Sequence, residues 1–153
     1  MCGICGILHH EPQKSVDESL IKKMTSVLEH RGPDEEGIYT NDSIALGHRR
    51  LKVMDLSSNA AQPMCNPEKT LWIVFNGEIY NFMRLRRELE QQGYVFRSES
   101  DTEVILYLYE QEGIACLEKL RGMFAFAIWD ATKRRLFIAR DRVGKKPLFY
   151  TRT

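Results

Sequence analysis

A cysteine stands directly after the initiator methionine. Methionine is usually removed when the second residue is small, and Cys2 would then carry both a thiol and a free α-amine. Ordinary pKa values are about 8.5 for a thiol and about 7.7–8.0 for an α-amine, so part of the amine is unprotonated at neutral pH. That amine could take the thiol proton, which would make one residue both nucleophile and base. The alternative is that Cys2 is an inert, small apolar residue.

A pair of hydrogen-bond donors follows the apolar segment 71–75, which reads as a buried strand. The Asn76 amide and the Gly77 backbone N–H, aimed at one point, would stabilise the oxyanion that forms when a thiolate attacks a carbonyl. Removing one such donor typically costs about 2.7–4 kcal/mol. Asn-Gly is also the commonest turn of a tight β-hairpin, and the sequence leaves both interpretations open.

Arg50 and Asp101 are candidates for binding the two charged groups of an amino acid. A guanidinium matches a carboxylate in bidentate fashion, and a carboxylate matches an α-ammonium. The alternatives are that Arg50 forms a solvated basic pair with Arg49, and that Asp101 only favours the dipole at the start of a helix. His30 and His48 have no obligatory role beside an amine base, so we expect both to be structural.

Cys2 and Cys5, with the histidine pair at 9–10, look like half of a metal site. A structural zinc normally needs two paired ligand sets, and the two other cysteines lie isolated from each other in the sequence. In a strand over residues 3–8, Cys2 and Cys5 would also point to opposite faces. We therefore expect no metal, and four reduced cysteines.

The composition is that of one ordinary globular domain. The 153 residues include 43% hydrophobic and 28% charged residues, and the formal net charge is +1. This charge gives no electrostatic reason to expect nucleic acid or an anionic membrane as a partner. The longest apolar run, 123–129, is far too short to span a bilayer, and no signal peptide is recognisable. A cytoplasmic location follows by default.

The order of the expected elements predicts an α+β fold rather than a repeating βαβ unit. Capping-box patterns at 15–18 and 100–103 mark two helix starts. A polar turn between two apolar runs near the end of the chain is typical of a hairpin. We expect strands at 3–8, 37–40, 43–49, 71–75, 123–129 and 135–140, and helices from 15 to about 30, at 82–92, 102–112 and 114–120.

Read in order, the candidate residues fall within a set of motifs that spans essentially the whole chain. These motifs closely resemble the glutaminase domain of glutamine-hydrolysing asparagine synthetases, which are class II glutamine amidotransferases of the N-terminal-nucleophile hydrolase type. The Arg-Gly-Pro-Asp segment favours the asparagine synthetase branch. The segments are MCGICGI (1–7), HRGPD (30–34) with Gly37, HRRL (48–51), NGEIYN (76–81), SDTEVI (100–105), RGMFAF (121–126) and RDRVGKKPL (140–148).

The resemblance implies one glutamine amidotransferase type 2 domain over residues 1–153, with a four-layer αββα sandwich of two antiparallel sheets between helices. It implies that Cys2 is the nucleophile with its own amine as the base. It further implies that Asn76 and Gly77 form the oxyanion hole, and that Arg50 holds the α-carboxylate of glutamine.

The resemblance also implies the remaining contacts of the substrate. Asp101 and Glu78 would hold the α-amino group of glutamine, and backbone groups around Leu51 and Val53 would line the substrate. Arg31 would support the site around Cys2 without taking part in the chemistry. The reaction would be hydrolysis of glutamine to glutamate and ammonia, which needs no metal or organic cofactor.

In the family, a second domain activates aspartate with ATP and Mg and receives the ammonia internally. This chain lacks the Ser-Gly-Gly-rich pyrophosphate loop of that domain, so we expect the synthetase domain to be absent and the acceptor to be a separate or removed part. The apolar surface that would face it makes a homo-oligomer plausible. A non-catalytic domain that binds glutamine as a sensor or scaffold remains the alternative function.

Overall fold

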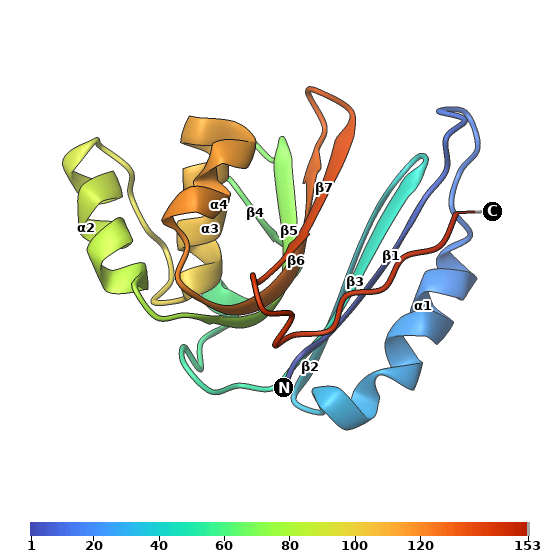
Figure 1. Cartoon of the computed structure of the whole chain (residues 1–153). Helices are drawn as coiled ribbons and strands as arrows, with labels where there is room; N and C mark the ends of the chain where they lie inside the picture. The colour runs from blue at the N-terminus through green and yellow to red at the C-terminus, as the bar shows by residue number, and fades with distance from the viewer. Residues whose placement is uncertain (153) are drawn as a thin grey trace.

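Two antiparallel β-sheets pack face to face, and helices cover the outer side of each (Figure 1). The computed structural model describes residues 1–152. The first sheet has the strand order β1-β3-β2 and lies under α1, and the second has the order β4-β5-β6-β7 and lies under α2, α3 and α4. The expected four-layer αββα sandwich is confirmed. The strands and helices are β1 (Gly3–Leu8), α1 (Glu18–Val27), β2 (Glu35–Asn41), β3 (Ile44–Arg50), β4 (Met64–Cys65), β5 (Leu71–Ile79), α2 (Phe82–Gln91), α3 (Asp101–Glu112), α4 (Cys116–Lys119), β6 (Gly122–Asp130) and β7 (Arg135–Arg140).

Strand β3 is buried along its whole length because α1 covers one face and the second sheet covers the other. Leu46 packs against Val74 of β5 between the two sheets. Ala45 points the opposite way and packs against Ile21 of α1. Fully burying an aliphatic side chain contributes about 1.5–3 kcal/mol, so the alternation of side chains along β3 holds three layers together.

Helix α1 begins later than the capping-box pattern at 15–18 predicts. Asp17 is the N-cap, and its carboxylate accepts a hydrogen bond from the Ser19 backbone N–H at 2.8 Å. The helix ends at Val27, and a 3₁₀ turn over Glu29–Arg31 follows it. Aspartate and serine are equally good N-cap residues, so the sequence offers both Ser15 and Asp17 as caps. The capping-box pattern therefore predicted the helix correctly but placed its first residue too early.

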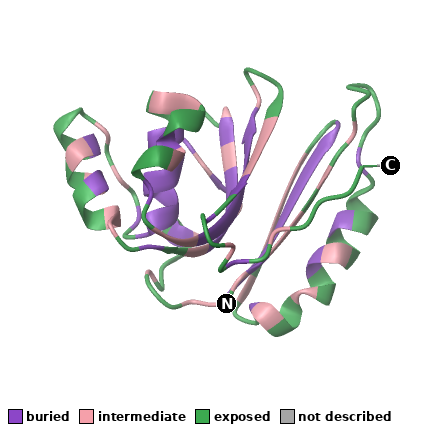
Figure 2. Ribbon diagram, in the orientation of Figure 1, coloured by how far each residue is buried: buried purple, intermediate pink, exposed green. Residues whose placement is uncertain are grey.

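Helix α3 packs on the second sheet, and its first nine residues, 101–109, are all buried (Figure 2). It lies between the second sheet and α2, which contributes the buried Leu85 and Leu89. Gly113 ends α3 with a φ of +61°, a left-handed conformation that glycine adopts readily. In place of the single helix expected over 114–120, the chain forms a 3₁₀ turn, Gly113–Ala115, followed by the short α4.

The Asn76-Gly77 pair is not a hairpin turn. Strand β5 continues through it to Ile79, with Gly77 opposite Phe124 of β6. A Cβ atom at Gly77 would lie 2.2 Å from the Met123 carbonyl oxygen, so this pairing requires glycine for close contact rather than for a turn. The hairpin expected near the end of the chain is confirmed as β6 and β7.

Gly47→Ala should lower the free energy of unfolding by about 1–3 kcal/mol, the usual cost of overpacking a core. Gly47 faces α1, and a Cβ there would lie 2.3 Å from the Thr25 hydroxyl and 2.7 Å from the Cys5 sulfur. Chemical denaturation measures the change. Gly6→Ala, at an exposed position of β1 where the nearest atom would be 3.0 Å away, is the control. Equal stability of Gly47→Ala and the unchanged protein would contradict the packing described here.

Candidate active site

One cavity of about 250 Å³ opens where the end of β3, the middle of β5 and the start of α3 meet. Its walls include all eight residues that the sequence and the resemblance assign to catalysis and substrate binding. These residues come from four separate parts of the chain. They are Cys2, Arg50, Leu51, Val53, Asn76, Gly77, Glu78 and Asp101.

Cys2 lies against the segment that follows β3. Its Sγ is 3.5 Å from the Leu51 backbone nitrogen and 3.9 Å from the Leu51 carbonyl oxygen. Arg31 holds the main chain here, since its Nε donates to the Cys2 carbonyl oxygen at 3.1 Å. Cys5 points the other way, toward the Thr25 hydroxyl under α1, as the strand alternation predicts. Within residues 1–152, no three His, Cys, Asp or Glu side chains are grouped so that they could hold a metal ion.

Strand β5 has a free edge on the side away from β6. The short strand β4 pairs only with Trp72 and Ile73, so beyond Ile73 this edge has no neighbouring strand. The Tyr80 N–H, just after β5, donates to Arg121 on the β6 side. Because backbone groups alternate along an antiparallel strand, those of Phe75, Gly77 and Ile79 must point to the free edge.

Side chains satisfy several of the backbone groups on this free edge. The Phe75 N–H donates to the Gln62 Oε1 at 2.6 Å, and the Ile79 N–H donates to the Asp101 Oδ2 at 2.8 Å. The Gly77 N–H lies between them and faces the cavity. Asn76 is only 5% exposed and also lines the cavity, and its side chain makes no hydrogen bond to a described residue. Two donors therefore lie side by side at the cavity wall.

Arg50 is not part of a solvated basic pair, so that alternative is wrong. It is 5% exposed, and its guanidinium donates to the Glu35 carboxylate at 2.8 Å and to the carbonyl oxygens of Ser57 and Asp55. Arg49 points to the opposite face of the sheet and pairs with Glu36 there. The side chain of Arg50 is thus buried, neutralised and fixed in the cavity wall.

Asp101 is the first residue of α3 and is 4% exposed. Burial, with a smaller contribution from the nearby Glu78, raises its pKa to about 6. Its side chain reaches the cavity and the edge of β5 and so does more than favour the helix dipole. Ser100 caps the helix, as the 100–103 pattern predicts, through a bond from the Thr102 N–H.

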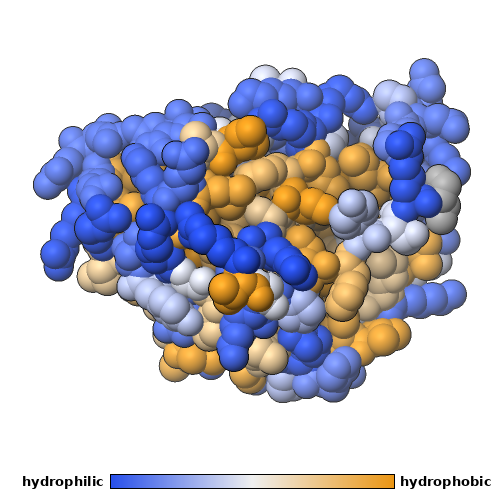
Figure 3. Space-filling model, viewed as in Figure 1, coloured by the Kyte–Doolittle hydropathy of each residue, from blue (hydrophilic) through white to orange (hydrophobic). Residues whose placement is uncertain are grey.

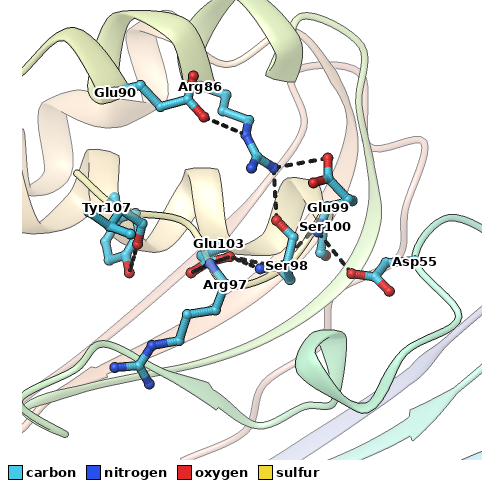
Figure 4. Close-up of polar contacts among 10 residues, drawn as sticks. Asp55, Arg86, Glu90, Arg97, Ser98, Glu99, Ser100, Glu103 and Tyr107 are labelled. Atoms are coloured by element: carbon cyan, nitrogen blue, oxygen red, sulfur yellow. Dashed lines mark hydrogen bonds and ion pairs between the residues drawn. The ribbon is translucent and has the colours of Figure 1, made fainter. Parts of the chain in front are cut away.

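The carboxylate of Glu103 does not close the expected capping box at the start of α3. It accepts instead from the backbone N–H groups of Arg97 and Ser98 and from the Ser98 hydroxyl (Figure 4). The Asp55 carboxylate accepts from the Glu99 N–H at 2.8 Å. The loop that holds Arg50 is therefore attached to the segment that positions Asp101.

His48 is fully buried between the sheets, and its Nε2 lies 3.1 Å from the Phe75 carbonyl oxygen. A carbonyl can only accept, so Nε2 carries the proton. Burial lowers the pKa of His48 to about 4, which keeps it neutral at pH 7, and its Nδ1 has no partner among the described residues. His30 is exposed, does not line the cavity and contacts the Val27 carbonyl.

Sequence reasoning missed several further residues of the cavity wall, among them Gln62, Thr102 and Lys146. Lys146 is 5% exposed, and its Nζ lies 2.9 Å from the Met1 sulfur. The buried Asp141 fixes this segment by accepting from the backbone N–H groups of Phe124 and Lys146. Only the RDRVGKKPL motif indicated that this part of the chain belongs near the site. Thr102 lies within the SDTEVI motif but was given no role, and no local pattern pointed to Gln62.

A family model described as a glutamine amidotransferase domain matches residues 1–153. The chain belongs to the glutamine amidotransferase family. Asparagine synthetase [glutamine-hydrolyzing] 1 of Bacillus subtilis is 46% identical to this domain over 153 residues, which are 99% of this chain and 24% of that protein. Asparagine synthetase B [glutamine-hydrolyzing] of Escherichia coli is 40% identical over 97% of this chain and 26% of its own length.

Solved structures show the same fold. The glutamine phosphoribosylpyrophosphate amidotransferase of B. subtilis, complexed with ADP and GMP, superposes on this amidotransferase domain with a TM-score of 0.72 at 24% identity, over 90% of this chain and 37% of that one. The structure of the allosteric regulatory enzyme of purine biosynthesis gives a TM-score of 0.66. The resemblance drawn from the sequence motifs is confirmed. Among residues 1–152, no helix has the length and apolar character needed to cross a membrane.

The raised pKa of Asp101 predicts how Asp101→Asn changes the pH dependence of stability. Between about pH 6 and the ordinary pKa of 3.8, folded Asp101 binds a proton that the unfolded chain releases, so acidification through this range favours the folded domain. The variant lacks this contribution. Its free energy of unfolding should therefore fall more steeply on acidification from pH 6 to pH 4, by up to about 1.4 kcal/mol per pH unit.

Urea denaturation at several pH values measures both slopes. His48 works in the opposite direction, because its lowered pKa makes acidification below pH 6.5 destabilising, and it is retained in both proteins. Equal slopes for the unchanged domain and Asp101→Asn would contradict a buried Asp101 with a raised pKa.

Proposed function

We propose that this domain hydrolyses glutamine to glutamate and ammonia, with the Cys2 thiol as nucleophile once Met1 has been removed. The observation that supports this most is the single cavity that holds the Cys2 thiol, two unused hydrogen-bond donors, a fixed guanidinium and two carboxylates. The family membership and the names of the relatives agree with the same reaction.

The charged groups orient the substrate. Arg50 holds the α-carboxylate of glutamine, and Asp101 and Glu78 hold the α-ammonium. The segment around Leu51 and Val53 lines the aliphatic part of the substrate. With both charged groups on the α-carbon of glutamine held in this way, its side chain extends so that the amide lies at the Cys2 sulfur, and orientation of this kind removes much of the entropic barrier of the attack.

The chemistry uses groups of the chain alone. The Cys2 α-amine takes the thiol proton, and the sulfur forms a bond to the amide carbon of glutamine. The Asn76 amide and the Gly77 N–H hold the resulting oxyanion. The amine then gives its proton to the departing nitrogen, the carbon–nitrogen bond breaks, and ammonia leaves. Water hydrolyses the glutamyl thioester, which releases glutamate and restores the thiol. No metal or organic cofactor takes part.

The ammonia passes, in our proposal, to an ATP-dependent synthetase domain or subunit. The chain spans about a quarter of the length of the curated relatives that it matches, whose names describe asparagine synthetases. ATP and Mg would belong to that partner, with aspartate as the acceptor. Apolar residues gather across the middle of the face in Figure 3, and Val143, Phe149 and Tyr150 are 83–90% exposed, which fits a covering partner or a second copy.

Cys2→Ala should abolish the release of glutamate from glutamine, because the variant has no nucleophile. The unchanged protein must have its N-terminus sequenced, since a retained Met1 keeps the Cys2 nitrogen in a peptide bond. Cys5→Ser is the matched control, because Cys5 lies three residues away but points under α1, and it should keep its activity. A protein that begins at Cys2 and binds glutamine without releasing glutamate would be a sensor or scaffold instead.

Glutamine should bind Cys2→Ala more weakly as the pH falls below about 6. Protonation of Asp101, whose raised pKa is about 6, removes the negative charge that attracts the α-ammonium. Isothermal titration calorimetry between pH 5 and pH 8 measures this dependence. A Cys2→Ala, Asp101→Asn double variant should bind weakly at every pH, and a pH-independent affinity of Cys2→Ala would argue against this role of Asp101.

A further inference from the structure

Gln62 connects the free edge of β5 to the start of α3. Its side-chain oxygen accepts from the Phe75 N–H at 2.6 Å, and its side-chain nitrogen donates to the Thr102 hydroxyl at 3.2 Å. Gln62 is 9% exposed, Phe75 is 3% exposed and Thr102 is 1% exposed, so the whole connection is shielded from water. The Gln62 amide thus joins two parts of the cavity wall, Phe75 of β5 and Thr102 of α3.

The main chain of Gln62 is fixed as well. A Cβ atom at Gly37 of β2 would lie 1.9 Å from the Gln62 carbonyl oxygen, so the first sheet packs directly against this residue. The first sheet also supplies His48, whose Nε2 holds the Phe75 carbonyl. Both backbone polar groups of Phe75 are therefore held by side chains, and Phe75 immediately precedes the Asn76-Gly77 pair.

A second connection lies on the other side of Gly77. Asp101 accepts from the Ile79 N–H, and so it also joins the edge of β5 to α3. Gly77 is two residues from each attachment point, and its own N–H is the outward-pointing donor between them. The two connections fix the stretch of β5 that carries the oxyanion donors relative to the helix that carries the α-ammonium acceptor.

We propose that Gln62 is a positioning residue for the oxyanion hole, acting through Phe75 and Thr102 without touching the substrate. This rests on the proposed glutaminase function. The oxyanion exists only after the thiolate has attacked, and its donors must lie about 2.7–3.1 Å from it. Displacement of the donors by about 1 Å can cost on the order of a hundredfold in rate. Arg50 and Asp101 are held by contacts of their own, with Glu35 and with the Ile79 N–H, so the loss of Gln62 affects kcat more than KM.

Asn66 offers a matched control for Gln62. It is another buried side-chain amide that joins β5 to α3: it accepts from the Leu71 N–H at 3.0 Å and donates to the Glu110 carboxylate. These contacts lie at the opposite ends of the same two elements, far along the chain from Gly77. Removing the Asn66 amide therefore weakens the same layer contact without disturbing the oxyanion donors.

The test compares Gln62→Met with Asn66→Leu in protein that begins at Cys2, using glutamate release and thermal unfolding. Both variants replace an amide by an apolar side chain of similar size, and both should lower the melting temperature. Gln62→Met should lower kcat at least tenfold with KM for glutamine changed less than threefold, whereas Asn66→Leu should keep kcat. Thr102→Val should lower kcat in the same way, and Thr102→Ser, which keeps the hydroxyl, should restore it.

Several results would overturn the positioning role. The first is an unchanged kcat in Gln62→Met, and the second is an equal loss of kcat in Asn66→Leu. The third is a rise in KM that accounts for the whole loss of kcat/KM, which would indicate that Gln62 contacts glutamine directly. If Gln62→Met does not fold, Thr102→Val provides the test, and an unchanged kcat in Thr102→Val rejects the proposal. Inactivity of the unchanged protein would instead reject the glutaminase function on which the proposal rests.

Discussion

The architecture of the site depends on one incomplete pairing in the second sheet. Strand β5 is paired with β6 along its whole length, but β4 covers only two of its residues on the other side. Buried backbone N–H and C=O groups must find partners, and here side chains from three separate segments supply them. Gln62, His48 and Asp101 each bond one group of the free edge. The Gly77 N–H, which points the same way, remains for a ligand.

The charges of the cavity follow from the same need for buried groups to be satisfied. A buried ion without a partner is costly, and Arg50 avoids this cost through Glu35 and two carbonyl oxygens. Asp101 is less fully compensated, which is why burial raises its pKa to about 6. A substrate that brings an α-ammonium to Asp101 would supply the missing counter-charge.

Close backbone contacts make this arrangement specific. Gly77 allows β6 to approach β5, and Gly37 allows β2 to approach the Gln62 main chain. A side chain at Gly77 would force apart two paired strands of the second sheet, and one at Gly37 would push β2 away from the Gln62 main chain. The same motif that provides the donor at Gly77 thus also sets the spacing of the second sheet, and this explains why a local pattern that reads as a turn occurs inside a strand.

The sequence by itself determined the fold class, most element positions and eight of the residues that line the cavity. Period-two and helical spacing of apolar residues report burial directly, and the motifs carry the site residues in order. Only the tertiary structure decided that Asn76-Gly77 lies within β5, that Arg50 is buried and paired, and that Gln62 joins β5 to α3. These features depend on contacts between residues such as Gln62 and Thr102, which are 40 positions apart. No local pattern encodes such contacts, because they arise only when the layers pack.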